Sequence, residues 1–100
     1  KQHKLIILDP GFETWFVTNW SPAQDRSYSY YKYWNDQYVQ AWNFKAMQPR
    51  HAHFFENTIQ YDPHENYGMD VMRKLYYYFR WVEIELRIPI LDMPRMRRPI

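Results

Sequence analysis

Residues 69–86 read Met69-Asp-Val-Met-Arg-Lys-Leu-Tyr-Tyr-Tyr-Phe-Arg-Trp-Val-Glu-Ile-Glu-Leu86. Apolar residues recur in this stretch every three or four positions, which is the spacing of one face of an α-helix. These residues are Val71, Leu75, Phe79, Val82 and Leu86. Asp70 precedes Lys74 by four residues, the order of charges that stabilises an exposed helix face. The pattern predicts an amphipathic helix whose apolar face needs a second element to cover it.

A second long helix is predicted to provide that cover. It begins at one of two serines, Ser27 or Ser29, and extends to about Met47. Aromatic residues recur in it at every fourth position, namely Tyr30, Trp34, Tyr38 and Trp42, whereas its opposite side is polar. We therefore expect the two long helices to pack through their aromatic stripes.

The N-terminal stretch combines a strand signal with a turn signal. Residues 4–8 read Lys-Leu-Ile-Ile-Leu, a short apolar run typical of a buried strand. Two interpretations of the following Asp9-Pro10-Gly11 stay open. The three residues form a type II turn in which Gly11 takes a positive φ, or Asp9 caps a helix with Pro10 at its first position. A short helix over residues 12–18 follows in either case.

Three shorter segments complete the predicted architecture. Residues 21–24 read Ser-Pro-Ala-Gln and predict a single capped helical turn. Residues 58–61 alternate as a short strand does, and residues 88–91 are extended and could lie beside the first strand. The predicted fold class is α+β: a compact, α-rich single domain with two long helices, a short helix and one or two short strands.

Length and composition set limits on this domain. One hundred residues support one core over positions 1–100, in which Trp34, Trp42 and Phe79 are predicted to be buried. Hydrophobic residues make up 46% and charged residues 24%, which excludes disorder of the whole chain. No run approaches the ~20 apolar residues of a membrane-spanning helix. Residues 92–100 form a basic tail without packing periodicity, which we expect to fray.

Several kinds of chemistry lack their sequence signature. The absence of Cys excludes disulfides, thiolate catalysis and Cys-based zinc sites. A chain with two glycines holds no Gly-rich phosphate loop. His51, His53 and Glu56 are candidate metal ligands, but a polar loop explains them more simply, and we predict no metal and no cofactor. A net charge of +2 gives little reason to expect nucleic acid, which leaves contact through the basic tail as the weakest alternative.

Two Asp-Pro segments supply the carboxylates of a candidate enzyme. If the two turns face each other, Asp9, Asp62 and Glu65 could act as the acid and base of a small hydrolase. Helix capping accounts for the same three residues without any catalysis. The hydrolase therefore stands as the alternative function, and no catalytic residue is predicted.

Aromatic residues, at 21% of the chain, exceed what a small core needs. Tyr28 and Tyr33 lie off the inward stripe of the first long helix. Tyr77 lies off the inward stripe of the last helix, beside Arg73 and Arg80. Rings next to guanidinium groups suit a glycan or a protein partner. We predict a non-enzymatic binding surface formed by these five residues, unless the tyrosines only shield the edge of the core.

Four stretches carry a family resemblance: residues 5–15, 21–27, 35–43 and 61–68, the last running on into 74–79. Their most specific parts are Asp-Pro-Gly-Phe and Tyr-Asp-Pro followed by Tyr-Gly. Together they resemble a family of small uncharacterised Bacteroidetes proteins, classed as a domain of unknown function. Members look like secreted or lipid-anchored proteins, so the resemblance implies a location in the cell envelope, periplasm or extracellular space. Because the chain starts at Lys1 without Met, we expect that an N-terminal segment has been removed.

Overall fold

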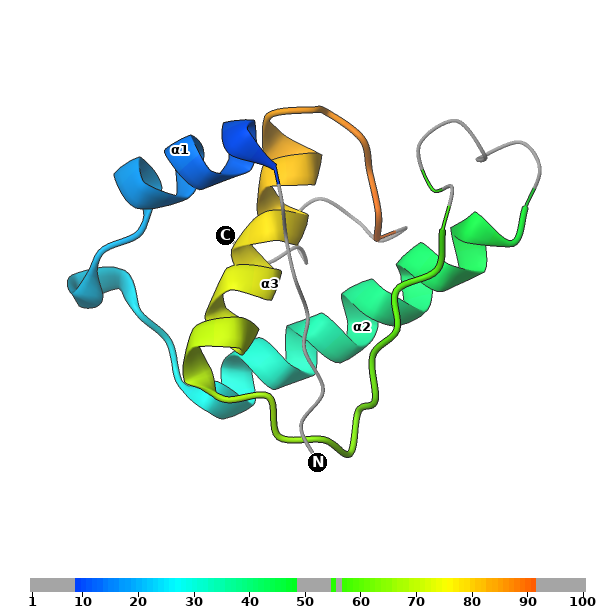
Figure 1. Ribbon diagram of the computed structural model, residues 1–100, viewed down its shortest axis with the longest axis horizontal. Helices are drawn as coiled ribbons and strands as arrows, with labels where there is room; N and C mark the ends of the chain where they lie inside the picture. The colour runs from blue at the N-terminus through cyan, green and yellow to red at the C-terminus, as the bar shows by residue number, and fades with distance from the viewer. Residues whose placement is uncertain (1–8, 49–54, 56, 92–100) are drawn as a thin grey trace.

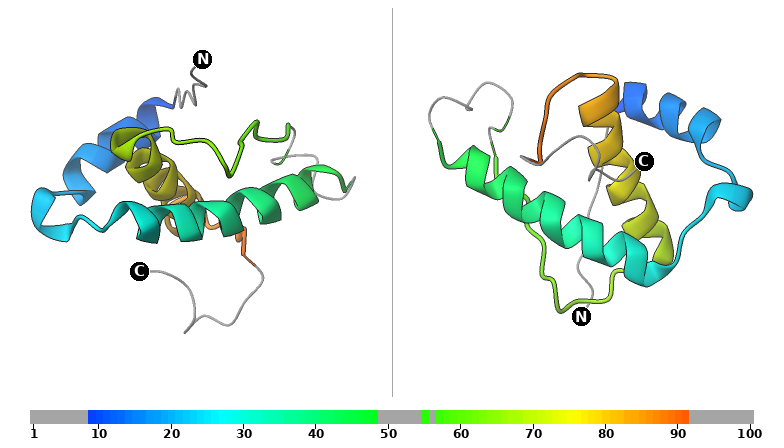
Figure 2. Two further views of the ribbon diagram at one scale, coloured as in Figure 1. Left: turned by 90° about the horizontal axis from the view of Figure 1, so that it is seen from below. Right: turned by 180° about the vertical axis from the view of Figure 1, so that it is seen from behind.

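A computed structural model describes residues 9–48, 55 and 57–91 of the chain. Four helical elements follow one another within them: α1 (Pro10–Asn19), the 3-10 turn η1 (Pro22–Gln24), α2 (Tyr28–Ala46) and α3 (Met69–Ile84) (Figure 1). The helix α3 packs against both other α-helices, which lie on its two sides in every view (Figures 1 and 2). Because α1 and α2 each cover only one side of α3, part of the α3 surface stays uncovered, and a cleft can form there.

The first helix begins at an aspartate cap. The side chain of Asp9 accepts hydrogen bonds from the backbone N–H groups of Gly11 at 2.9 Å and Phe12 at 3.2 Å. Pro10 occupies the first turn, where its missing N–H costs nothing. Of the two interpretations left open by the sequence, the helix cap is therefore confirmed. The type II turn is wrong, because Gly11 is helical and does not take a positive φ.

The two long helices have different starts. Ser27 caps α2 by accepting a hydrogen bond from the N–H of Tyr30 at 3.1 Å. Gly68 precedes α3 with φ +92°, a conformation that residues with a Cβ rarely adopt. No atom lies within 4 Å of where a Cβ on Gly68 would stand, so the backbone conformation alone calls for glycine there.

The core lies along both sides of α3. The largest fully buried side chains are Tyr31, Tyr38, Phe12, Phe79, Met72, Ile90, Val82 and Asn35. Tyr38 of α2 stacks on Phe79 of α3 with ring centroids 4.9 Å apart, so the two long helices meet through aromatic side chains as predicted. Trp42 is buried as well, whereas Trp34 is only partly buried at the edge of the core.

The α+β fold class is wrong, because the described residues contain helices and no strand. At residues 58–61, the amide side chain of Asn43 takes the place of a neighbouring strand. Its Oδ1 accepts the N–H of Ile59 at 2.7 Å, and its Nδ2 donates to the carbonyl of Ile59 at 3.1 Å. These backbone groups are satisfied by a helix side chain and do not need a β-ladder.

A second side chain replaces the other expected strand. Both backbone N–H groups at Ile90 and Leu91 donate to Oε2 of Glu83, at 3.0 and 3.1 Å. This holds residues 88–91 against α3 as an irregular segment (orange in Figure 1). The expected strand at 4–8 and the basic tail at 92–100 lie outside the described residues.

Candidate ligand-binding cleft

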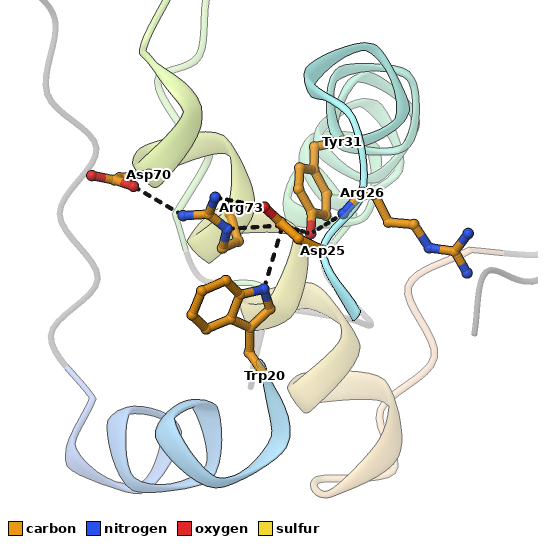
Figure 3. Close-up of polar contacts among 6 residues, drawn as sticks. All are labelled: Trp20, Asp25, Arg26, Tyr31, Asp70 and Arg73. Carbon is orange, nitrogen blue, oxygen red and sulfur yellow. Dashed lines mark hydrogen bonds and ion pairs between the residues drawn. The ribbon is translucent and has the colours of Figure 1, made fainter. Parts of the chain in front are cut away.

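A cluster of polar side chains ties the segment before α2 to α3 (Figure 3). Asp25 accepts two hydrogen bonds from Arg73, at Nε (3.0 Å) and Nη2 (2.8 Å). The hydroxyl of Tyr31 donates to the same carboxylate at 2.6 Å, and the indole N–H of Trp20 donates at 3.3 Å. The Arg73 guanidinium and these further donors hold the pKa of Asp25 well below its usual range.

The partners of Asp25 are themselves anchored. The hydroxyl of Tyr31 also accepts the backbone N–H of Arg26 at 3.1 Å, and burial, with the bond to Asp25, raises the pKa of Tyr31. The Arg73 guanidinium lies over the Trp20 ring at 4.7 Å and donates to Asp70 at 2.9 Å. The 3-10 turn η1 and the residues after it are therefore held in a defined place beside α3.

This arrangement leaves a cleft of about 600 Å³ between α1, η1 and α3. Ten residues line it: Trp15, Asn19, Ala23, Gln24, Asp25, Arg26, Tyr76, Tyr77, Arg80 and Ile84. They come from α1, from η1 with the two residues after it, and from α3, which lies far from the other two segments in the sequence. The cleft therefore exists only after α1 has packed on α3.

Aromatic rings form one side of the cleft. Tyr77 lies edge-on to Phe16 with centroids 5.5 Å apart and is tilted against Trp15 at 6.3 Å. Tyr76 is edge-on to Tyr30 of α2 at 5.6 Å, and their hydroxyl oxygens are 3.2 Å apart. These contacts fix the ring orientations before any ligand arrives.

Two arginines bring positive charge to the cleft. The guanidinium of Arg26 lies over the Tyr30 ring at 4.9 Å, and in Figure 3 it points away from the Asp25–Arg73 pair. No carboxylate among the described residues pairs with Arg26. Arg80 donates through Nη1 to Glu83 at 3.2 Å, while its Nε and Nη2 make no hydrogen bond within the described part of the chain.

The arrangement is suited to binding rather than to proton transfer. Asp25 is the carboxylate that lines the cleft, and three side chains already donate to it. A general base needs a pKa near the working pH, and the pKa of Asp25 is held well below its usual range. The cleft presents aromatic rings, guanidinium donors and the amide side chains of Asn19 and Gln24.

The structure divides the five residues predicted to form a binding surface. Tyr77 and Arg80 line the cleft. Arg73 lies next to it, held by Asp25. Tyr33 is 57% exposed on α2, and Tyr28 is partly buried.

Sequence reasoning predicted two of the ten lining residues, Tyr77 and Arg80, and missed the other eight, among them Trp15, Arg26 and Tyr76. Tyr76 and Arg80 are four residues apart, and this spacing was the available signal for one side of the site. Nothing local to Trp15 or Arg26 indicates that they face α3. Their place depends on how α1 packs.

The carboxylates of the hydrolase alternative do not meet. Asp9 caps α1, and Asp62 accepts the backbone N–H of His64 at 2.9 Å. The start of α1 and the turn at 62–65 lie at opposite ends of the molecule (Figure 1). The candidate metal ligands His51, His53 and Glu56 lie outside the described residues. Within the described ranges, no three His or acidic side chains gather in a way that could hold a metal ion.

Comparison with known proteins gives a family. Residues 2–96 match the model described as "Family of unknown function (DUF6146)". The chain belongs to this family. Of the resemblance seen in the sequence, membership of a family of unknown function is thereby confirmed. The matched residues include those of the cleft and of the core. No curated protein and no solved structure matches the chain.

None of the described helices combines the length and the apolar composition that crossing a bilayer requires.

Proposed function

We propose that this chain is a non-enzymatic binding module that takes a carbohydrate in the cleft between α1, η1 and α3. One observation carries the proposal: rings and guanidinium groups from three segments converge on a single hollow of about 600 Å³. Small-molecule sites commonly have volumes of ~300–1,000 Å³. The hollow shape favours a small ligand over the flat face of a protein partner.

The chemistry of the lining fits a sugar. A pyranose ring has an apolar C–H face and a rim of hydroxyl groups. The aromatic faces of Trp15 and Tyr77 suit the C–H face, and they are held at fixed angles by their neighbours. Guanidinium N–H groups at Arg26 and Arg80 suit the hydroxyl and ring oxygens, because arginine presents several donors in one plane.

We also propose that the protein acts in the cell envelope, periplasm or extracellular space. The support for this location is the resemblance of residues 5–15 and 61–68 to a family whose members look secreted or lipid-anchored. Envelope glycans would be the local source of ligands. Fractionation of cells that express the full-length gene tests the location, and recovery in the cytosolic fraction alone would contradict it.

A cleft-filling variant tests the binding function. Ala23 is exposed and lines the cleft, so Ala23→Trp fills the hollow without removing a buried contact. We expect wild type to bind members of a glycan array and Ala23→Trp to lose that binding at an unchanged melting temperature. In parallel, the indole N–H resonance of Trp15 should shift on titration with the best array ligand.

The matched control is Gln37→Trp, which adds the same side chain at an exposed position of α2 outside the cleft. It should bind as wild type does. Binding that survives in Ala23→Trp, or that is lost equally in both variants, would overturn the assignment of the ligand to this cleft.

A further inference from the structure

We propose that the cleft selects a carbohydrate with a single acidic group, a carboxylate or a phosphate, which Arg26 and Arg80 hold together. The inference rests on the proposed binding function and names its ligand class. It comes from the two guanidinium charges at the cleft and from the N–H donors that the fold leaves unused on each of them.

Arg26 is the first of these charges. Its guanidinium carbon lies 4.9 Å from the centroid of the Tyr30 ring, and no carboxylate among the described residues compensates its charge. Its side-chain N–H groups make no hydrogen bond to a described residue. A guanidinium can pair with the two oxygens of a carboxylate or phosphate in a bidentate manner. Arg26 thus has hydrogen-bond donors available for an acid.

Arg80 supplies the second set of donors. Its side chain is 12% exposed, and Nη1 is engaged by Glu83. Its Nε and Nη2 make no hydrogen bond in the described part of the chain. They are not buried unsatisfied atoms, because among the described residues Oδ1 of Asn35 is the only buried side-chain N or O atom without a partner. Since Arg80 lines the cleft, these donors are open to a ligand in it.

Two tyrosines connect the arginines. Tyr30 lies under Arg26, and its hydroxyl is 3.2 Å from that of Tyr76, one turn of α3 before Arg80. Either hydroxyl can donate to the other, so the O–H that stays free belongs to Tyr76 or to Tyr30. Tyr76 lines the cleft, and burial raises its pKa, so its hydroxyl is protonated at neutral pH in either case. The pair therefore adds a hydroxyl, as donor or acceptor, to the guanidinium N–H groups of the two arginines.

The negative charges near the cleft limit the ligand to one acidic group. Arg73 compensates Asp25, and Arg80 with Tyr38 compensates Glu83. The carboxylate of Glu85, by contrast, accepts the indole N–H of Trp15 at 3.1 Å and brings a negative charge to that side. The Glu85 carboxylate would repel a ligand with several negative charges, whereas a sugar whose single acid lies at Arg26 would not be repelled.

The test uses three disaccharides that differ only at one C6: cellobiose, its uronic acid cellobiouronate and its 6′-phosphate. Titration is followed by the Trp15 indole resonance and by calorimetry. We expect the better acid to bind at least about tenfold more tightly than cellobiose, the effect of one charge-assisted hydrogen bond. Comparison of the two acids identifies whether a carboxylate or a phosphate is preferred.

Arg26→Gln should remove that preference: within the variant, the acid should bind no more tightly than cellobiose, whatever the variant's affinity for cellobiose itself. The fold should be kept, because the Arg26 guanidinium makes no ion pair among the described residues. Arg87→Gln is the control, because it removes the same charge at an exposed position outside the cleft. Arg80→Lys keeps a cation beside Glu83 but loses the planar fork, and it should weaken acid binding partially.

The outcomes separate this inference from the proposed function. Equal binding of all three disaccharides, abolished by Ala23→Trp, would overturn the acid preference and leave the carbohydrate cleft standing. An acid preference that persists in Arg26→Gln, or that is lost equally in Arg87→Gln, would overturn the role of Arg26. If none of the three binds and the array is silent, the proposed function and the inference both fail.

Discussion

Tyr38 of α2 donates its hydroxyl to the carboxylate of Glu83 in α3, with 2.8 Å between the two oxygen atoms. The other carboxylate oxygen accepts the backbone N–H groups of Ile90 and Leu91. The side chain of Glu83 is 3% exposed. Burial and the charge of Glu83 raise the pKa of Tyr38, so its hydroxyl remains protonated at neutral pH. One buried carboxylate thus joins α2, α3 and the segment after α3.

Removing this hydroxyl should destabilise the fold. Tyr38→Phe keeps the ring that stacks on Phe79 and removes the hydroxyl, which donates to Glu83 and accepts a longer hydrogen bond of 3.5 Å from Nη1 of Arg80. Because a hydrogen bond to a charged group contributes about 1.5–3 kcal/mol, we expect a loss of that size in the free energy of unfolding in urea. Tyr33→Phe removes an exposed hydroxyl and serves as the control. Equal effects of the two changes would contradict a contribution of the Tyr38–Glu83 bond.

The Asp25–Arg73 pair predicts a specific response to acid. The pKa of Asp25 is lower in the folded chain than in the unfolded chain, chiefly because Arg73 donates to it. The ionised Asp25 carboxylate therefore makes its whole contribution to the free energy of unfolding at pH values above its ordinary pKa of ~4. This contribution is lost as the pH falls toward the folded-state pKa. We expect Asp25→Asn to be less stable than wild type at pH 7, and the difference to shrink between pH 5 and pH 2 in urea unfolding.

Asp70→Asn is the matched control for that experiment. Asp70 also bonds to Arg73, but its side chain is 99% exposed, and ion pairs in water contribute little. It should change the free energy of unfolding only slightly at any pH. A difference between wild type and Asp25→Asn that is constant with pH would contradict the assignment of the charge effect to Asp25.

The two glycines should respond differently to alanine. Gly68→Ala puts a Cβ on a residue with φ +92° and ψ 159°, a region that is essentially restricted to glycine, and should cost about 1–3 kcal/mol. Gly11 is helical, so Ala gains helix propensity of up to about 1 kcal/mol. The new Cβ would lie 3.3 Å from Oδ1 of Asp9, and this tight contact offsets the gain. Thermal melts that rank Gly11→Ala below Gly68→Ala would contradict the helical start at Asp9.

Asn43 should be required for the order of the segment at Ile59. Asn43→Ala leaves the N–H and C=O of Ile59 without their partner, and each unsatisfied group costs about 1–3 kcal/mol where water cannot replace it. We expect faster hydrogen exchange at the Ile59 amide and a lower free energy of unfolding. Gln40→Ala, at an exposed position of the same helix, should change neither. Unchanged exchange at Ile59 would refute this role.

Much of the helical structure could be predicted from the sequence. The expected helix from residue 27 or 29 to about 47 is α2, Tyr28–Ala46, and the expected helix over 69–86 is α3, Met69–Ile84. These helices depend on the spacing of apolar side chains and on caps such as Ser27, which act within about one turn. Such signals are local, so they can be read without knowledge of the fold.

The strands were predicted wrongly for a related reason. The sequence patterns at 58–61 and 88–91 indicate that the backbone is not helical there. They do not indicate which groups will form hydrogen bonds with its N–H and C=O groups. The partners are Asn43 and Glu83, side chains on helices that look like ordinary polar positions in the sequence. Only packing brings them to those backbone groups.

The sequence by itself determined three helices, a serine cap at the start of α2 and an aromatic core, because each depends on residues a few positions apart. The tertiary structure decided which rings of α3 form a cleft. Rings stand side by side at Tyr76, Tyr77 and Tyr78, so periodicity does not distinguish their environments. Packing of α1 on one side of α3 and α2 on the other leaves Tyr76 and Tyr77 at a hollow with Arg80 and places Tyr78 against Phe12, since two helices cannot cover the whole circumference of a third.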